Sequence, residues 1–415
     1  MIELSGKYNT AKVFTDNIDE GAVGQIIQLC NNLVSYGSNI AIMPDVHAGK
    51  GCTIGTTMTI TDKIVPNLVG VDIGCGVNVV PITVAEDFDW IKELDKTIRK
   101  IIPSGTRVRN KPHKFLENIP LYDLRCIDHV NLSRIEKSVG TLGGGNHYIE
   151  VNYDELGRYY LTVHSGSRSL GKEVAEFYQN KAYKILNDTK SLQAQEIQDA
   201  VRQLQKSNQT GRIEAVIQEI KDKYTKVIKL DKQLAYLQGS DMEDYFHDML
   251  IATEYAYWNR SAITHDIIHS LVGRIDYAPD DWAYSAFSCV HNYIDFGAGI
   301  LRKGAVSAQD NELIIIPISM RDGSIIAVGK GNPDWNYSAP HGAGRLLSRS
   351  SARKEVSLAM FVESMDGIFT TSVNNATIDE CCFAYKDIDE ILTNIGDTVD
   401  VIRVIKPIYN FKSSY

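Results

Sequence analysis

"GVDIGCGVNVVPITV", Gly70–Val84, joins a glycine-rich turn to a run of β-branched residues. The Val, Ile and Thr residues of this run predict a short strand over residues 76–84. The turn in front of the strand carries Asp72 and Cys75. Functional side chains concentrate in loops beside regular elements, so the stretch indicates both a β-rich fold and a site at the edge of a sheet.

Five further loops repeat this arrangement of an apolar run beside a glycine or small-residue turn. They are "MPDVHAGKG" (43–51), "GGGNHYIE" (143–150), "LTVHSGSRSLG" (161–171), "FSCVHNYID" (287–295) and "SAPHGAGR" (338–345). Each carries a histidine, and the first adds Asp45 in front of His47. Because all six loops share one pattern, we expect them to converge on a single site.

Other segments predict the remaining framework. Asp19 is placed to cap a helix with apolar residues at helical spacing, and residues 87–102 repeat that spacing. Apolar runs predict strands over residues 39–46, 53–60, 283–291, 312–320 and 324–331. Between these β-rich parts the sequence is charged and helical. We therefore expect an α+β fold in which residues 1–415 form a single domain, with a mainly helical insertion at about 172–270.

Composition limits the class of protein. The chain has 415 residues, of which 44% are hydrophobic, enough for a large buried core. It has no apolar run of the roughly 18 residues that a membrane span needs, and "MIELSGKYNT" lacks the pattern of a signal peptide. We expect a cytoplasmic protein with reduced thiols and no membrane partner.

A net charge of −9 excludes the global positive field of many nucleic-acid-binding proteins. An RNA partner would need a local patch of basic side chains. The candidates for phosphate contacts are Arg107–Lys114, Arg345, Arg349, Arg353 and Lys354.

The side chains of the six loops suit a metal centre. Asp72, Cys75, His147, His164 and His291 supply one carboxylate, one thiolate and three imidazoles, a set that fits a divalent transition metal. Five ligands exceed the needs of one open catalytic site, and a thiolate can bridge, so we expect two ions that share Cys75. Paired cations suit the handling of phosphates, and the glycines allow backbone N–H groups to approach an anion.

Five other histidines lack this loop setting, and for them a structural role is expected. They are His113, His129, His247, His265 and His269. His265 and His269 have i, i+4 spacing, but no Glu follows His265 as the metalloprotease pattern H-E-x-x-H requires.

Six motifs, in order along the chain, carry a resemblance to a known family. "MPDVHAGKG", "VGVDIGCGV", "GGGNHYIE", "VHSGSRSLG", "VHN" and "HGAGRLLSR" resemble the motif series of the RtcB family of RNA-splicing and RNA-repair ligases. The resemblance runs from about Met43 to the C-terminal "YNFK". One departure is "PISMRDG", 317–323, where the family usually has "PGSMG", and this change alters a turn expected to contact guanine.

The resemblance implies roles for individual residues. Two manganese ions would be held by Asp72, Cys75, His147, His164 and His291, with Cys75 bridging, and GTP would be the co-substrate. His341 corresponds to the histidine that becomes guanylylated. The positions that the resemblance assigns to the nucleotide are Asn146, His147, Tyr148, Ile149, Glu150, His291, Asn292, Pro317, Ile318, Ser319, Met320, Ser324, His341, Gly342, Ala343, Gly344 and Lys412.

The implied reaction joins RNA carrying a 3′-phosphate or 2′,3′-cyclic phosphate to RNA carrying a 5′-hydroxyl, in RNA repair or tRNA splicing. It would proceed through guanylylated His341 and an RNA-3′-pp-5′-G intermediate. Two alternatives stay open. A dinuclear metal-dependent phosphoesterase acting on RNA would use the metals to activate water, and a metal-dependent RNA-binding regulator would have no catalytic step.

Overall fold

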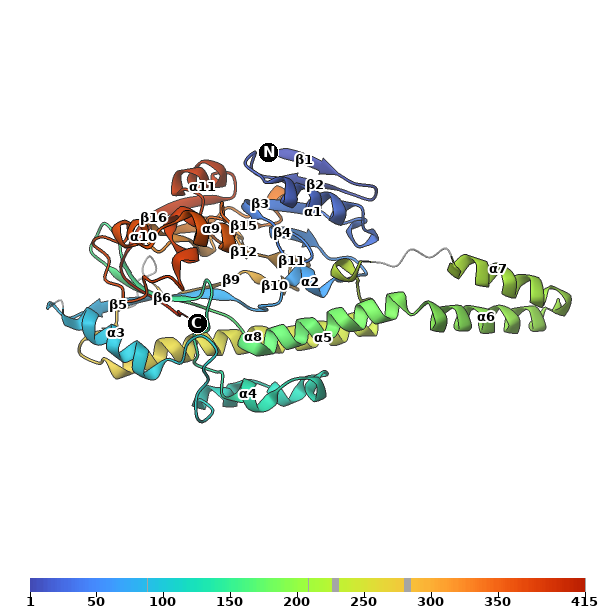
Figure 1. Ribbon diagram of the computed structural model, residues 1–415, viewed down its shortest axis with the longest axis horizontal. Helices are drawn as coiled ribbons and strands as arrows, with labels where there is room; N and C mark the ends of the chain where they lie inside the picture. Colours follow the sequence, from blue (N-terminus) through green and yellow to red (C-terminus); the bar gives the residue numbers. More distant parts are fainter. Residues whose placement is uncertain (88, 208, 226–230, 280–284, 415) are drawn as a thin grey trace.

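The computed structural model describes residues 1–87, 89–207, 209–225, 231–279 and 285–414. Two β-sheets lie side by side in the body, and long helices run beneath them (Figure 1). Antiparallel pairing dominates, and in the described residues neither sheet closes into a barrel. Strands and helices are segregated, so the fold is α+β, as predicted.

The larger sheet is antiparallel throughout. Its strands, in order across the sheet, are β13 (Leu313–Ser319), β14 (Gly323–Gly329), β16 (Val399–Lys412), β6 (Tyr148–Tyr153), β7 (Tyr159–Ser165), β5 (Gly76–Val84) and β8 (Ile275–Tyr277), with β9 (Phe287–Val290) also paired to β5. Strand β5, which lies between β7 and the strands β8 and β9, is buried over Gly76–Ile82, because its Val and Ile side chains pack on both faces.

The smaller sheet contains the first strands of the chain. Its order is β1 (Ile2–Ser5), β2 (Thr10–Val13), β3 (Ile40–His47), β4 (Ile54–Thr59), β11 (Ile300–Lys303) and β10 (Asn292–Asp295). β2 and β3 run parallel, and the other pairs are antiparallel. A separate ribbon joins β12 (Ala305–Ser307) to β15 (Ser338–Pro340).

The helices differ greatly in length. They are α1 (Glu20–Cys30), α2 (Pro66–Val69), α3 (Asp89–Ile101), α4 (Leu132–Glu136), α5 (Arg168–Asn187), α6 (Thr189–Lys206), α7 (Ile213–Thr225), α8 (Ser240–Ser270), α9 (Arg349–Glu355), α10 (Leu358–Ser364) and α11 (Ile388–Ile395). Asp19 caps α1 by accepting a hydrogen bond from the backbone N–H of Ala22, 2.9 Å away, which satisfies one of the free donors of the first turn. Figure 1 shows α5 and α8 lying side by side beneath the sheets.

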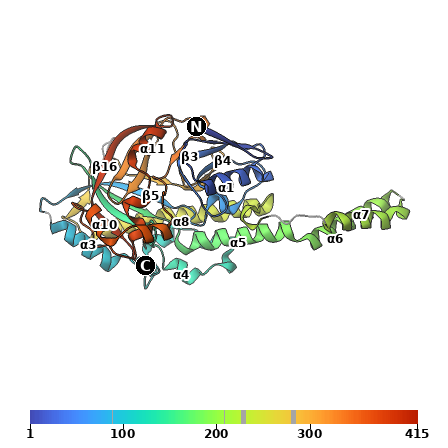
Figure 2. The same ribbon diagram turned by 45° about the horizontal axis from the view of Figure 1, so that its top comes forward.

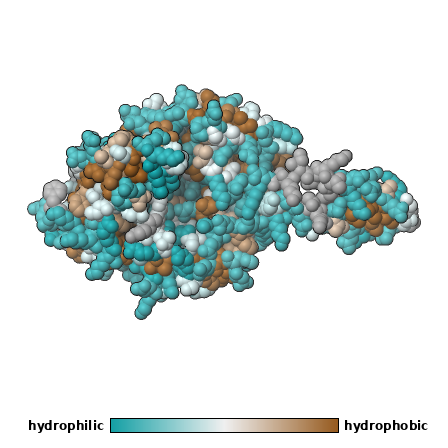
Figure 3. Space-filling model, viewed as in Figure 1, coloured by the Kyte–Doolittle hydropathy of each residue, from teal (hydrophilic) through white to brown (hydrophobic). Residues whose placement is uncertain are grey.

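Residues of the predicted helical insertion have two different environments. α5 and α8 contribute Val174, Tyr178, Met249 and Tyr255 to the largest apolar core. α6 and α7 instead form a hairpin that projects beyond the body (Figures 1 and 2), with Lys223 and Glu196 joined by an ion pair of 2.7 Å. The surface in Figure 3 is mainly hydrophilic, with some apolar side chains on this arm. The description of residues 1–415 as one domain with an insertion at about 172–270 stays a prediction.

Most predicted elements correspond to observed ones. The strands predicted over 39–46, 53–60 and 76–84 are β3, β4 and β5, and those over 312–320 and 324–331 are β13 and β14. The helix predicted over 87–102 is α3, although residue 88 lies outside the described residues. The strand predicted over 283–291 is β9, whose first predicted positions, 283 and 284, also lie outside them.

Among the described residues, no helix has the length and apolar character needed to cross a membrane.

Candidate active site

Cysteine and histidine side chains that lie in or beside β5, β6, β7 and β9 meet at one site. The Sγ atom of Cys75 lies 3.4 Å from Nε2 of His147 and 3.3 Å from Nε2 of His164. Nε2 of His164 is also 3.5 Å from Nε2 of His291, and Nε2 of His147 is 3.0 Å from a carboxylate oxygen of Asp72. The structure therefore brings together all five side chains that the sequence suggested as metal ligands.

Hydrogen bonds on the far side of two of these rings determine which nitrogen carries the proton. Nδ1 of His147 lies 2.9 Å from the carbonyl oxygen of Leu142, and Nδ1 of His164 lies 3.2 Å from that of Asn146. A carbonyl can only accept, so Nδ1 carries the proton and donates it. Nε2 of His164 then directs its lone pair toward Cys75 and His291, which is how histidine ligands of metal ions are normally oriented, whereas Nε2 of His147 faces both Cys75 and the Asp72 carboxylate.

Burial favours the neutral forms of three of these side chains, Cys75, His164 and His291. Burial, followed by the Asp72 carboxylate, raises the pKa of the Cys75 thiol well above its usual value. Burial also lowers the pKa of His164 and His291 well below their usual values. A thiol and neutral imidazoles whose lone pairs converge fit a divalent transition metal, because the cation would deprotonate the thiol and use the lone pairs.

Arg260 of α8 forms hydrogen bonds to the segments that carry these ligands. Its guanidinium donates to the carbonyl oxygens of Gly74 and Ser165, at 2.8 and 3.0 Å, and to the side-chain oxygen of Asn78 at 2.9 Å. The side chain is fully buried. Gly74 precedes Cys75 and Ser165 follows His164, so this one guanidinium positions two ligand loops.

His341 lies beside the ligand group but is oriented by a different partner. Its Nδ1 is 2.7 Å from Oδ2 of Asp45, and its backbone N–H donates to the same oxygen at 3.1 Å. The ring centroids of His341 and His291 are 4.6 Å apart. Because the Asp45 carboxylate accepts the Nδ1 proton, Nε2 of His341 keeps a free lone pair. This arrangement is suited to nucleophilic attack.

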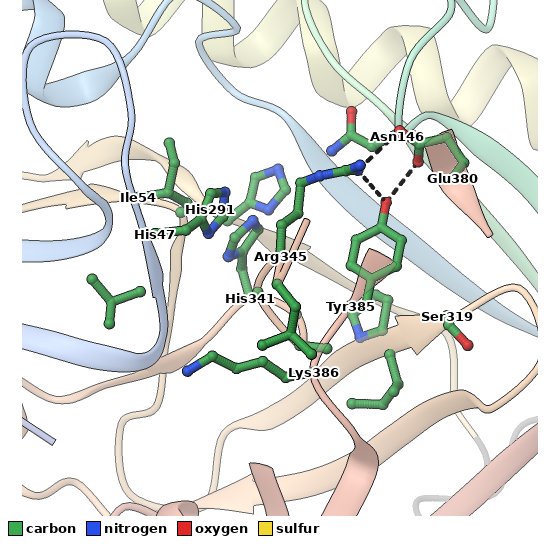
Figure 4. A pocket seen from close by; sticks show the side chains of 18 of the residues that line it. His47, Ile54, Asn146, His291, Ser319, His341, Arg345, Glu380, Tyr385 and Lys386 are labelled. Carbon is green, nitrogen blue, oxygen red and sulfur yellow. Dashed lines mark hydrogen bonds and ion pairs between the residues drawn. The ribbon is translucent and has the colours of Figure 1, made fainter. Parts of the chain in front are cut away.

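A second set of polar side chains lies across the cavity from His47 and Ile54 (Figure 4). The Glu380 carboxylate accepts hydrogen bonds from Tyr385 at 2.7 Å and Lys412 at 3.0 Å, and it forms an ion pair with Arg349 at 2.7 Å. Although burial opposes ionisation, the Lys412 and Arg349 charges lower the pKa of Glu380 to about 2. Burial raises the pKa of Glu150 to about 7, against the attraction of Lys412.

The cavity has a volume of about 840 Å³, and most of the predicted site residues line it. These are Asp72, Cys75, Asn146, Tyr148, Glu150, His164, His291, Asn292, Pro317, Ile318, Ser319, Met320, His341, Gly342, Ala343, Gly344 and Lys412. His147, Ile149 and Ser324 do not line it. His147 still contacts Cys75 of the ligand group. Ile149 packs in the apolar core, because alternate residues of a strand point to opposite faces.

Asn292 and Ser319, two further predicted nucleotide contacts, also form hydrogen bonds within the protein. Asn292 donates from its amide to the carbonyl oxygen of Asp72 at 3.1 Å and accepts from the backbone N–H of Gly304 at 2.9 Å, so it ties two loops together. Ser319 donates to Asp322 at 2.6 Å. The strand register shifts between Pro317 and Ser319, so the altered "PISMRDG" turn forms an irregular β13–β14 connection.

Glycines near the site are required mainly by close packing of the protein itself. Gly143 has a φ of +89°, and a Cβ there would lie 1.9 Å from the Arg168 guanidinium. Gly344 has a φ of +77°, and its Cβ would lie 2.4 Å from the backbone of Asp45. Any larger residue at Gly344 would therefore displace the strand that orients His341.

A second histidine group lies outside the cavity and has a different chemistry. Nδ1 of His113 accepts from the backbone N–H of Phe115 at 3.1 Å, so the neutral ring carries its proton on Nε2, which faces Asp266 at 3.2 Å. Asp266 also accepts from Arg109 at 2.6 Å, and Lys114 lies 3.3 Å from Nε2 of His265. Bound protons and positive charges occupy this group, so a cation is disfavoured there.

The basic side chains suggested for RNA phosphates are largely engaged within the protein. Arg109 is paired with Asp266, Arg349 and Arg353 with Asp379, and Arg345 with Glu380. Arg349 and Arg353 are each about half exposed and can still face a ligand.

The sequence did not single out Glu380, Tyr385, Arg168 or Arg260. Glu380 and Tyr385 flank two cysteines in a segment without a glycine loop. Arg260 occupies one position of a long helix. A charged residue at a helical position that should be apolar is the one signal that could have found it.

The chain is similar to one described family over most of its length. The family described as "tRNA-splicing ligase RtcB" matches residues 27–120 and 114–413. The RNA-splicing ligase RtcB of Escherichia coli strain K12 is 32% identical over 400 residues, covering 89% of each chain. The tRNA-splicing ligase RtcB of Aeropyrum pernix is 26% identical over 447 residues, covering 88% of this chain and 85% of the relative.

Proposed function

The chain belongs to the RtcB family of RNA-splicing ligases, and from this premise we propose that it joins RNA 3′-phosphate or 2′,3′-cyclic phosphate ends to 5′-hydroxyl ends with GTP as co-substrate. The observation that carries the proposal is the position of His341. Its Nδ1 is held by Asp45 at 2.7 Å and its ring lies beside His291, so a nucleophilic Nε2 adjoins the ligand group.

We assign the metal positions to Asp72, Cys75, His147, His164 and His291, with Cys75 between two manganese ions. When bound, such ions supply positive charge that stabilises the anionic oxygens of a phosphate under attack. Glu150, Lys412 and Asn146 are assigned to the guanosine nucleotide, together with the remaining cavity positions that the sequence suggested. We also propose that residues 1–415 act as one catalytic domain in the cytoplasm.

In the first step, Nε2 of His341 attacks the α-phosphate of GTP and pyrophosphate leaves. Asp45 stabilises the positive charge that develops on the imidazole, because its carboxylate accepts the Nδ1 proton. The guanylyl group then passes to the RNA 3′-phosphate, and His341 is restored. Finally, the 5′-hydroxyl of the second RNA end attacks the activated phosphate and GMP leaves.

The test is incubation with α-labelled GTP and manganese, followed by denaturing electrophoresis, for the wild type beside H341A. We expect an acid-labile label on the wild type alone. If neither protein is labelled while both bind the metal, the ligase proposal is wrong. Hydrolysis of RNA phosphodiesters under those conditions would support the dinuclear phosphoesterase.

A further inference from the structure

The cavity continues past His341 into a region that the nucleotide assignments leave unused. Its walls are Ile18, Val46, His47, Ala48 and Ile54, which we call the His47 lobe. In Figure 4, His47 and Ile54 lie on one side of His341, while Asn146, Glu380, Tyr385 and Ser319 lie on the other. The nucleophile therefore stands between two compartments of one cavity.

A strand pair and a glycine place His47 close to His341. His47 pairs with Ile54 across β3 and β4. A Cβ on Gly304 would lie 2.2 Å from Ile54 and 3.1 Å from Cε1 of His341, so only glycine leaves room for these two side chains to adjoin. His47, Ile54 and His341 are thus successive neighbours along the cavity wall.

The tautomer of His47 is determined by the backbone. Its Nδ1 lies 3.0 Å from the carbonyl oxygen of Asp45, which can only accept, so Nδ1 carries the proton and Nε2 is a free base. The hydrogen bonds within the described part of the chain include none to this Nε2. Asp45 therefore orients two imidazoles, His47 through its carbonyl and His341 through its carboxylate.

The charges around His47 favour a neutral ring. Burial lowers the pKa of His47, and the nearby His341 and Arg345 act in the same direction, while Asp45 opposes them. A neutral imidazole with an exposed lone pair is the usual general base of enzymes.

The lobe suits an uncharged RNA end better than a phosphorylated one. Its walls are mostly apolar, and Asp19 adds a carboxylate to the same part of the cavity lining. The nearby Lys386 is engaged with the carbonyl oxygens of Asn17 and Pro44, at 2.9 and 3.0 Å, and with Glu390. A terminal nucleoside with a hydroxyl group would find apolar contact there, whereas a terminal phosphate would find the nearby cations, Arg345 and Lys386, already paired with Glu380 and Glu390.

We propose that the His47 lobe receives the RNA end that carries the 5′-hydroxyl, and that Nε2 of His47 removes the proton of this hydroxyl during joining. The inference rests on the proposed function. As the O5′–H bond breaks, its proton passes to Nε2 and O5′ forms a bond to the activated 3′-phosphorus. The bond from that phosphorus to the GMP oxygen breaks, and GMP leaves with the electron pair.

The experiment isolates the last step. Preformed RNA-3′-pp-5′-G is mixed with a 5′-hydroxyl strand and excess enzyme with manganese, and joining is followed in a single turnover. In H47N, the side-chain amide can still donate to the Asp45 carbonyl, but the base at the Nε2 position is gone. We expect joining to slow by roughly 100-fold or more, the usual contribution of a general base.

A 5′-thiol strand separates the role of a base from a structural role. A thiol with a pKa of about 8.5 is largely ionised at a pH of about 9 and needs no base. We expect H47N to join this strand within about tenfold of the wild-type rate, so that the thiol rescues most of the defect. H113N makes the same substitution outside the cavity and should join both strands at the wild-type rate.

Two outcomes would overturn the assignment. Joining of the hydroxyl strand by H47N within threefold of the wild-type rate, roughly the spread of small mutational effects, would show that no base was lost. Equal losses with the hydroxyl and thiol strands would show that His47 only shapes the lobe. Failure of the proposed function is a separate result, since it would appear as absence of label on wild-type His341.

Discussion

Two groups of histidines in this molecule look alike in composition and differ in chemistry. The cavity group joins His147, His164 and His291 to Cys75 and Asp72. The outer group joins His113 and His265 to Asp266. Both bring several potential ligand atoms within 4.8 Å of one another. Proximity alone therefore does not distinguish a metal site from an ion-pair cluster.

The difference lies in what the far side of each ring contacts. In the cavity, carbonyl oxygens accept the Nδ1 protons of His147 and His164, so Nε2 of each ring faces Cys75. In the outer group, the backbone N–H of Phe115 donates to Nδ1 of His113. The ring proton is therefore on Nε2, which faces Asp266. In the outer group, Arg109 also pairs directly with Asp266, and Lys114 lies against Nε2 of His265. Backbone hydrogen bonds decide which group can accept a cation.

Replacement of Cys75, the ligand that the two proposed ions share, should have the largest effect. In C75A, no thiolate remains between the imidazoles, and we expect manganese binding to fall by at least about 100-fold, more than the loss of a supporting residue costs. Guanylylation should fall to background with it. Metal analysis after dialysis and the labelling assay measure the two effects. A C75A protein that kept metal and full activity would refute a bridging role.

D45N should separate orientation from metal binding. The carboxylate that accepts the His341 Nδ1 proton is replaced by an amide, and we expect guanylylation to slow by about 10²- to 10⁴-fold, as when a triad aspartate is replaced. Metal content should stay at the wild-type level, because Asp45 contacts none of the proposed ligands. Loss of bound metal in D45N would contradict this separation.

The buried Glu380 carboxylate, paired with Lys412 and Arg349, should make the stability of the protein depend on pH. Its pKa is about 2 when folded, against an ordinary 4.5, so the unfolded chain binds more protons between these values. The stabilisation is complete above a pH of about 4.5 and is lost as the pH falls toward 2.

We expect E380Q to be less stable than the wild type at pH 7 by on the order of 3 kcal/mol. The difference should shrink steadily below pH 4.5, as measured by denaturant unfolding at several pH values. If the difference in the free energy of unfolding between E380Q and the wild type did not vary with pH, the ion pairs of Glu380 would contribute little to stability.

The smallest effect is expected in the outer group. H113N removes one hydrogen bond to Asp266 while Arg109 remains, so the free energy of unfolding should fall by about 1 kcal/mol. Bound manganese and guanylylation should equal those of the wild type. A loss of bound metal in H113N would mean that the two groups do not differ as their tautomers indicate.

The sequence predicted the parts of the site that depend on local pattern. Cys75, His164 and His341 each adjoin a strand and a glycine, and this repeated pattern indicated convergence before any distance was known. The strand that follows Cys75 was predicted for the same reason, because a β-branched run beside glycines has few alternatives.

Contacts between distant segments could not be predicted in this way. Glu380 approaches Lys412 through packing of separate elements, and nothing in the residues around Glu380 encodes that approach. Gly143 suggested an anion site, whereas the structure shows that it accommodates Arg168. The tautomers of His47 and His113 depend on individual backbone groups, which spacing and composition do not specify.

His291 lies at the point where the chain passes from one sheet to the other, between β9 and β10. Its backbone N–H donates to the carbonyl oxygen of Cys75 at 2.9 Å, and its carbonyl oxygen accepts from the backbone N–H of Gly304 at 2.7 Å. An ion held by His291 and His164 would therefore fasten the two sheets to each other. Calorimetry should then show a single cooperative melting transition for the metal-loaded protein, whereas removal of the metal should let the two halves melt more independently.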